Sequence, residues 1–177
     1  GSIALRIGDE KAARKQAEEN VRQLEEMGAK TVFTACAGCY RTLKKDYPDI
    51  LGKDLPFEIK HITEILYDLL KKEELTLNQA SEESLKITYH DPCHLGRHMD
   101  LYEIPRKLLE LIPGVELVEM KRNRNNAWCC GAGGGLKSQF PELALKISQE
   151  RINEAINSQA DILTTSCPFC INNLNDA

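Results

Sequence analysis

Residues 163–170 read LTTSCPFC, and residues 32–39 read VFTACAGC. Each stretch is a short run of β-branched and apolar residues that leads into two cysteines spaced Cys-x-x-Cys, which predicts a strand followed by a turn into a helix. The two stretches align at an offset of 131 residues, with residue 32 on residue 163. The same offset places Val21 on Ile152 and Gly28 on Gln159, so the chain contains an internal repeat.

The repeat divides the chain into two units. Following its register upstream puts the other cysteines of the first copy before residue 1, so we expect the chain to begin inside repeat one. Residues 1–84 are then the C-terminal part of a first copy plus a linker, and residues 85–177 are a complete second copy. The truncated first copy keeps only Cys36 and Cys39.

Helical and strand patterns alternate along both copies. Residues 9–27 place Ala13, Ala17 and Val21 on one helical stripe, and Gly28 predicts the end of that helix. We predict strands at 31–35, 57–62, 86–90, 115–120 and 162–166, helices from 63 and over 101–112 and 141–157, a loop at 129–135, and a linker at 72–84. This order predicts an α/β fold with parallel sheets flanked by helices.

Composition narrows the function classes. The chain has 177 residues, 42% of them hydrophobic, and a formal net charge of -4. No apolar run is long enough to cross a bilayer, and the basic residues form short clusters such as 122–124, which argues against a nucleic-acid surface. The odd cysteine count of 7 and the lack of a signal peptide favour a reducing, cytoplasmic setting.

Five of the 7 cysteines form one spaced signature: Cys93, the pair Cys129-Cys130, and Cys167 with Cys170. Cys93 and Cys167 directly follow predicted strands, and the carboxyl ends of parallel strands meet at one edge, where α/β folds bind their ligands. Helix N-termini at that edge lower the pKa of thiols and favour thiolates. The glycine-rich loop after Cys130 lets backbone amides approach sulfur closely. The signature therefore predicts a soft-metal site.

The number of thiols leaves the metal open. A tetrahedral zinc site or a cubane iron–sulfur cluster takes four thiolates, whereas this set offers five. The extra thiolate can bridge two irons, act as a nucleophile, or be a bystander, and a structural zinc with one spare thiol is the alternative. For Cys36 and Cys39 the absence of a metal is favoured.

Residues 86–177 resemble the cysteine-rich CCG domain of heterodisulfide reductase catalytic subunits. Residues 88–97, TYHDPCHLGR, and residues 129–135, CCGAGGG, carry the resemblance together with the final Cys-x-x-Cys. It implies two pseudo-repeated CCG units and a noncubane 4Fe-4S cluster held by Cys93, Cys129, Cys130, Cys167 and Cys170. Cys36 and Cys39, which match the end of the first CCG motif, are candidate further metal ligands, and zinc is a candidate substitute for the cluster.

The resemblance also implies a function. The chain would be part of an iron–sulfur disulfide/thiol oxidoreductase, with electrons supplied by other redox subunits or a ferredoxin-like domain and with a disulfide or thiol as substrate. It would lie in the cytoplasm, either free or on the cytoplasmic face of a membrane complex. By itself the chain would be inactive. The alternatives are an electron-transfer subunit of a glycolate-, lactate- or glycerol-3-phosphate-oxidising complex, or a structural zinc-binding module.

His94, beside Cys93, is the candidate catalytic residue. It could donate a proton to a leaving thiolate, or simply hydrogen-bond near the site. His90, His94 and His98 are spaced as one face of a helix, but Pro92 interrupts that helix.

Overall fold

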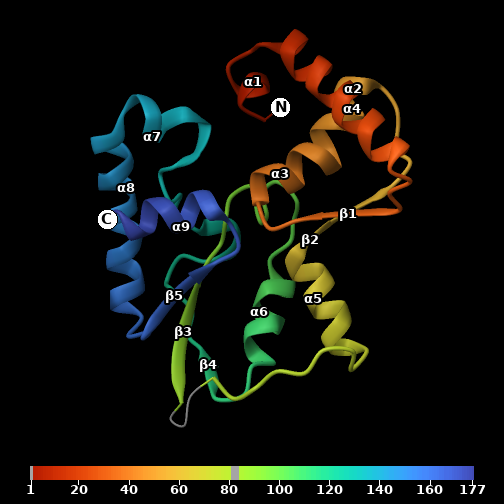
Figure 1. The fold of residues 1–177 in the computed structure, drawn as a ribbon. Helices are drawn as coiled ribbons and strands as arrows, with labels where there is room; N and C mark the ends of the chain where they lie inside the picture. The colour runs from red at the N-terminus through yellow and green to blue at the C-terminus, as the bar shows by residue number, and fades with distance from the viewer. Residues whose placement is uncertain (1, 81–83) are drawn as a thin grey trace.

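The computed structural model describes residues 2–80 and 84–177 and contains two parallel sheets flanked by helices (Figure 1). The elements are α1 (Ser2–Arg6), α2 (Glu10–Glu26), β1 (Thr31–Thr34), α3 (Ala37–Arg41), the π-helix η1 (Thr42–Asp46), α4 (Tyr47–Leu51), β2 (Glu58–His61), α5 (Ile62–Lys71), β3 (Leu85–His90), α6 (Glu103–Glu110), β4 (Val115–Leu117), the 3-10 turns η2 (Arg124–Asn126) and η3 (Gly133–Gly135), α7 (Leu136–Gln139), α8 (Pro141–Asn157), β5 (Ile162–Thr165) and α9 (Pro168–Asn175).

The first sheet pairs β1 with β2 in parallel, with Thr31 opposite Glu58 and Thr34 opposite His61. Helix α2 precedes it and begins at Asp9, whose Oδ1 accepts a hydrogen bond from the backbone N–H of Ala12 at 2.9 Å. Its buried stripe is the predicted one, and Gly28 follows with a left-handed φ of +67°. The predicted stripe and the predicted end of this helix are therefore confirmed.

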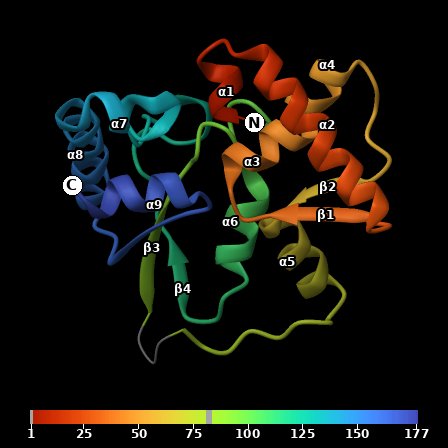
Figure 2. The same ribbon diagram turned by 45° about the horizontal axis from the view of Figure 1, so that its top comes forward.

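The second sheet has the strand order β4-β3-β5, with both pairs parallel. Helix α8 covers one side of it and α6 the other, and α5 packs against α6 (Figures 1 and 2). The predicted α/β class, with parallel sheets between helices, is confirmed.

Several predicted elements are shorter than expected. The strand predicted at 115–120 ends at Leu117, because Glu119 turns aside to pair with the buried Arg106 at 2.6 Å. The strand predicted at 57–62 ends at His61, whose ring accepts from the N–H of Thr63 while Glu64 accepts from the N–H of His61, so α5 starts at once.

The remaining boundaries differ modestly from the prediction. The helix predicted over 101–112 is confined to Glu103–Glu110. The loop predicted at 129–135 ends in η3, which leads directly into α7. Of the linker predicted at 72–84, residues 81–83 lie outside the described residues.

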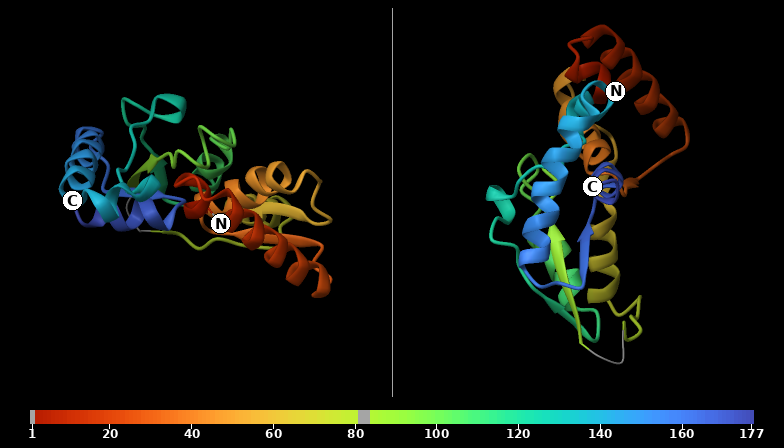
Figure 3. Two further views of the ribbon diagram at one scale, coloured as in Figure 1. Left: turned by 90° about the horizontal axis from the view of Figure 1, so that it is seen from above. Right: turned by 90° about the vertical axis from the view of Figure 1, so that its left-hand side faces the viewer.

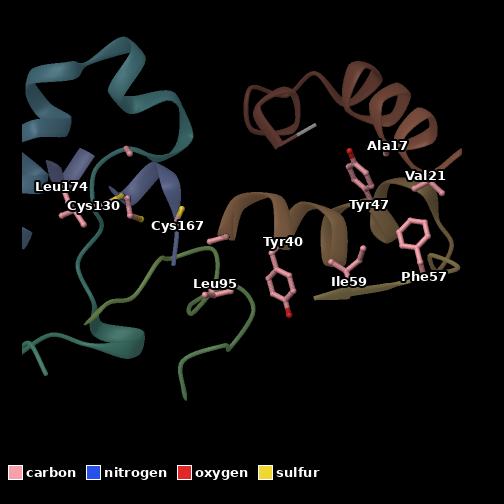
Figure 4. Packing of buried hydrophobic residues seen from close by; sticks show 13 residues of the cluster. Ala17, Val21, Tyr40, Tyr47, Phe57, Ile59, Leu95, Cys130, Cys167 and Leu174 are labelled. Atoms are coloured by element: carbon pink, nitrogen blue, oxygen red, sulfur yellow. The ribbon is translucent and has the colours of Figure 1, made fainter. Parts of the chain in front are cut away.

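One hydrophobic cluster runs through both halves of the molecule. It extends from Val21 and Phe57 beside the first sheet, through Tyr40 and Leu95, to sulfur-bearing residues near α9. Figure 4 shows Phe57 and Tyr47 at one end of this cluster, Tyr40 between, and the sulfurs of Cys130 and Cys167 toward the other end. Viewed from above, the first and second sheets with their helices lie next to each other (Figure 3, left). Among the described residues no helix has the length and hydrophobicity needed to span a membrane.

Candidate metal centre

Three strands carry cysteines to the region between the two sheets. Strand β1 ends just before Cys36, which caps the N-terminus of α3, and β5 ends just before Cys167, which occupies the N-cap position of α9. Strand β3 ends at His90, three residues before Cys93. At α3 the Sγ of Cys36 accepts a hydrogen bond from the backbone N–H of Cys39 at 3.5 Å. The predicted placement at a strand end and a helix start is thus observed for Cys36 and Cys167, whereas Cys93 lies in a turn after β3.

The Cys129-Cys130 pair is held in a tight turn against α8 and α9. Gly131 has a φ of +85°, and a Cβ there would lie 2.5 Å from the carbonyl oxygen of Ala144, so a side chain does not fit. The buried Asn173 donates from Nδ2 to the carbonyl oxygens of Cys130 (2.5 Å) and Ala144 (3.0 Å). The N–H of Gly131 donates to the Sγ of Cys129 at 3.3 Å, as the glycine-rich loop led us to expect.

All 7 cysteines are free and join one row of neighbouring sulfurs. Interactions between neighbouring thiols link them in the order Cys39, Cys36, Cys167, Cys170, Cys130, Cys129 and Cys93. Cys130, Cys167 and Cys170 in the middle are buried, whereas Cys39 and Cys129 are exposed. The structure therefore brings the five predicted ligands of the second copy together. It also places Cys36 of the first copy against Cys167.

Neighbouring thiols lower the pKa of two of these cysteines, which favours their thiolate forms. Hydrogen bonds from the thiols of Cys130 and Cys93 lower the pKa of Cys129 to about 2. Hydrogen bonds from Cys167 and Cys39 lower the pKa of Cys36 to about 2. The pKa of Cys130 shifts in the opposite direction. It rises to about 11, and the largest cause is the hydrogen bond that its thiol donates to Cys129. Converging cysteines whose neighbours lower the pKa of some of their thiols are a suitable donor set for a soft metal.

A buried histidine adjoins the middle of the row. A ring nitrogen of His90 and the Sγ atoms of Cys130 and Cys170 all lie within 4.8 Å of one another. Burial and the charge of Arg151 lower the pKa of His90 to about 3, so its imidazole is neutral. Arg151 donates from Nε to the Nδ1 of His90 at 3.0 Å.

His94, the predicted catalytic residue, is half-buried and stacks edge-on against His98, with ring centroids 5.3 Å apart. A Cβ built on Gly38 would lie 3.3 Å from the Nδ1 of His94 and 3.7 Å from the Sγ of Cys36, so His94 lies near the Cys36 end of the sulfur row. Burial, with the nearby charge of Arg41, lowers the pKa of His94. The histidines at 90, 94 and 98 do not form a helical metal face, because His90 ends β3.

A buried ion pair fixes the loop that carries Cys93. Asp91 accepts from both terminal nitrogens of Arg106, at 2.7 and 2.8 Å, and from the backbone N–H of Arg124 at 2.7 Å. Arg106 is 2% exposed and also pairs with Glu119. Asp91 is therefore a structural anchor for the turn into Cys93.

Arg106 and Arg151 contribute to the surroundings of the site but were not among its predicted residues. For Arg151 a signal was present, since it lies on the helical stripe of α8 that also contains Ala144, Ser148 and Ala155, all buried. A charged residue on such a stripe needs a buried partner.

Comparison with known proteins gives this arrangement a context. A family model described as CCG, cysteine-rich domain, matches residues 1–44 and 87–175. The chain is 46% identical, over 99% of its length, to one of the subunits of the dihydromethanophenazine:CoB–CoM heterodisulfide reductase of Methanosarcina acetivorans, and it covers 43% of that protein.

Two further relatives are more distant. The chain is 38% identical to one of the subunits of the fumarate reductase (CoM/CoB) of Methanothermobacter marburgensis, covering 100% of the chain and 34% of that protein. It is 36% identical to the probable iron-sulfur-binding oxidoreductase FadF of Bacillus subtilis, covering 99% of the chain and 24% of that protein. The chain thus spans less than half the length of each of these relatives.

Proposed function

The chain belongs to the CCG cysteine-rich domain family, and from that premise we propose that it is part of an iron–sulfur redox subunit. Cys93, Cys129, Cys130, Cys167 and Cys170 would bind a noncubane 4Fe-4S cluster, as the family resemblance implies. The observation that carries the proposal is the meeting of these five sulfurs, from three separate segments of residues 85–177, in one row.

The residues around the row suit such a cluster. The three middle sulfurs are buried, and the backbone N–H of Gly131 donates to the Sγ of Cys129, which favours an anionic centre. When bound, the cluster would supply electrons and an iron to which a substrate sulfur can bind. The protein supplies the ligands, excludes water with its core, and fixes the Cys93 turn through Asp91 and Arg106.

We propose that the reaction is reduction or formation of a disulfide. Reduction of one disulfide consumes two electrons and two protons and yields two thiols. The electrons would come from other redox subunits, in keeping with the subunit names of the longer relatives, or from a ferredoxin-like domain, as the family resemblance implies. His94 is the proposed proton donor to one released thiolate, because it directly follows the proposed ligand Cys93 and its Nδ1 lies on the side of the sulfur row that faces Gly38. Without an electron source, the chain by itself should not turn over.

Two alternative functions would appear as different outcomes of the experiment below. An electron-transfer role without a disulfide substrate is in keeping with the relative named an iron-sulfur-binding oxidoreductase. A structural zinc site would use four of the same thiols, since zinc also prefers sulfur ligands.

The deciding experiment is the metal and acid-labile sulfide content of anaerobically purified protein, together with the paramagnetic resonance spectrum of its oxidised form. We expect about four irons and four sulfides per chain with a spectrum unlike that of a cubane. About one zinc and no sulfide would contradict the cluster. A loaded chain that accepts electrons from a reduced donor but never reduces a disulfide would instead support electron transfer alone.

A further inference from the structure

Arg151 is a fully buried charge on the inner face of α8, with 0% of its surface exposed. Its Nη1 donates to the Oε2 of Glu154 and to the backbone carbonyl oxygen of Arg122, both at 2.7 Å. Glu154 is held in turn by the side chain of Arg122 at 2.9 Å. Burying an unpaired guanidinium would cost a large desolvation free energy, so Arg151 needs these partners. Because the partners have fixed positions, they also fix the orientation of the guanidinium.

What the guanidinium points at is His90. Its Nε donates to the Nδ1 of His90 at 3.0 Å. An arginine N–H can only donate, so the Nδ1 of His90 must accept with its lone pair. A neutral imidazole carries one proton, which is therefore on Nε2. Arg151 thus selects one tautomer of a ring that lies beside two cysteine sulfurs.

This tautomer decides what His90 can do. His90, Cys130 and Cys170 are close enough to resemble a three-ligand metal site, with their donor atoms within 4.8 Å of one another. The lone pair that a metal would need on His90 is already taken by Arg151, and the other nitrogen carries a proton. His90 is therefore unsuited to be a ligand and suited to be a hydrogen-bond donor.

We propose that His90 is a positioning residue, fixed by Arg151 and Glu154 as its Nε2–H tautomer, which donates that N–H toward the sulfurs of Cys130 and Cys170. The expected effect of His90 on a cluster rests on the proposed function. The assignment of its tautomer is independent of that function. Inside a water-poor site, an N–H donor stabilises negative charge on sulfur. Since reduction adds negative charge to a cluster, loss of the donor should lower the reduction potential.

The tautomer is tested first on metal-free protein with all thiols reduced and with 15N-labelled histidine. Wild-type protein at neutral pH should show His90 with an unprotonated Nδ1 and a protonated Nε2 in its 15N spectrum. The Arg151→Met variant should lose this preference and populate both tautomers. Protonation of His90 at Nδ1 in the wild type would overturn the proposal, whether or not the protein ever binds iron.

The effect on the cluster is tested on anaerobically reconstituted protein by a potentiometric titration followed by paramagnetic resonance. His90→Leu should keep the iron content and shift the midpoint potential downward. His90→Gln, whose side-chain amide can also donate, should recover part of the shift. The matched control is His61→Leu, which removes a second buried imidazole, one that contacts Thr63 at the start of α5. The control should lower thermal stability and leave the potential unchanged.

Two results would overturn this part. An unchanged potential in His90→Leu would show that the ring is only packing, and iron loss in His90→Leu but not in His61→Leu would make His90 a ligand. If wild-type protein assembles no cluster at all, the proposed function fails, and the 15N spectrum still decides the tautomer.

Discussion

The two Cys-x-x-Cys segments have the same local structure and different surroundings. In both, a parallel strand ends just before a cysteine that occupies the N-cap position of a helix, β1 before Cys36 and β5 before Cys167. Strand β5 pairs with β3, which leads to His90 and Cys93, whereas β1 pairs with β2, which leads to the capping residue His61. Cys167 and Cys170 are consequently buried among other sulfurs, while Cys39 is exposed at the end of the row.

This difference shows that the motif determines the local geometry and the neighbouring strand determines the site. A Cys-x-x-Cys turn offers two sulfurs wherever it occurs. The proposed cluster would need more ligands than that, and they would come from the segment after the neighbouring strand and from the Cys129-Cys130 loop.

The largest expected effect separates the two segments directly. Replacing Cys170 by Ser should remove most of the iron from anaerobically purified protein, because Cys170 lies between Cys130 and Cys167 in the sulfur row. Replacing Cys39, which neighbours only Cys36 within the row, should leave the iron content unchanged. Iron and acid-labile sulfide are measured per chain in both variants, and equal losses would remove the distinction between the two copies.

The next effect tests the ion pair that holds the Cys93 turn of the second copy. Arg106→Met leaves the carboxylate of Asp91 buried without its partner, and should lower the free energy of unfolding by about 3–5 kcal/mol. Denaturant titration of the metal-free, reduced protein measures the free energy of unfolding. The exposed pair of Arg14 with Glu18 is the control, and Arg14→Met should change the value by less than about 0.5 kcal/mol. Similar values for both variants would mean that Arg106 does not anchor the turn.

A smaller effect is expected in the loop that completes the second site. Gly131→Ala places a Cβ against the carbonyl oxygen of Ala144 at a positive φ, and should destabilise the protein by about 1–3 kcal/mol. Gly133→Ala is the matched control, since its Cβ would meet nothing within 4 Å. The same denaturant titration compares them. A neutral Gly131→Ala would show that the loop adjusts easily and does not require glycine there.

The smallest effect concerns the contact between the copies. Because Cys36 adjoins Cys167 without belonging to the proposed ligand set, Cys36→Ser should preserve the iron content and alter only the paramagnetic resonance spectrum, through the changed surroundings of Cys167. Loss of iron in this variant would instead make Cys36 a ligand and join the two copies into one metal site.

Much of the fold could be predicted because its signals are local. The alanine and valine stripe of α2, the glycine that ends it, and the β-branched runs before each Cys-x-x-Cys depend on residues a few positions apart. The boundaries of β2 and β4 were less accurate, since a capping histidine ends one and a distant arginine draws Glu119 out of the other. Such partners are invisible in a strand pattern.

The sequence by itself determined the α/β class, the repeat, and the set of cysteines, because residue type and spacing encode each of them. Only the tertiary structure decided that Cys36 meets Cys167, that Asp91 is neutralised by Arg106, and that Arg151 selects the tautomer of His90 across 61 residues of chain. These contacts join residues far apart in sequence, and a buried polar group takes its role from the partner that packing places beside it.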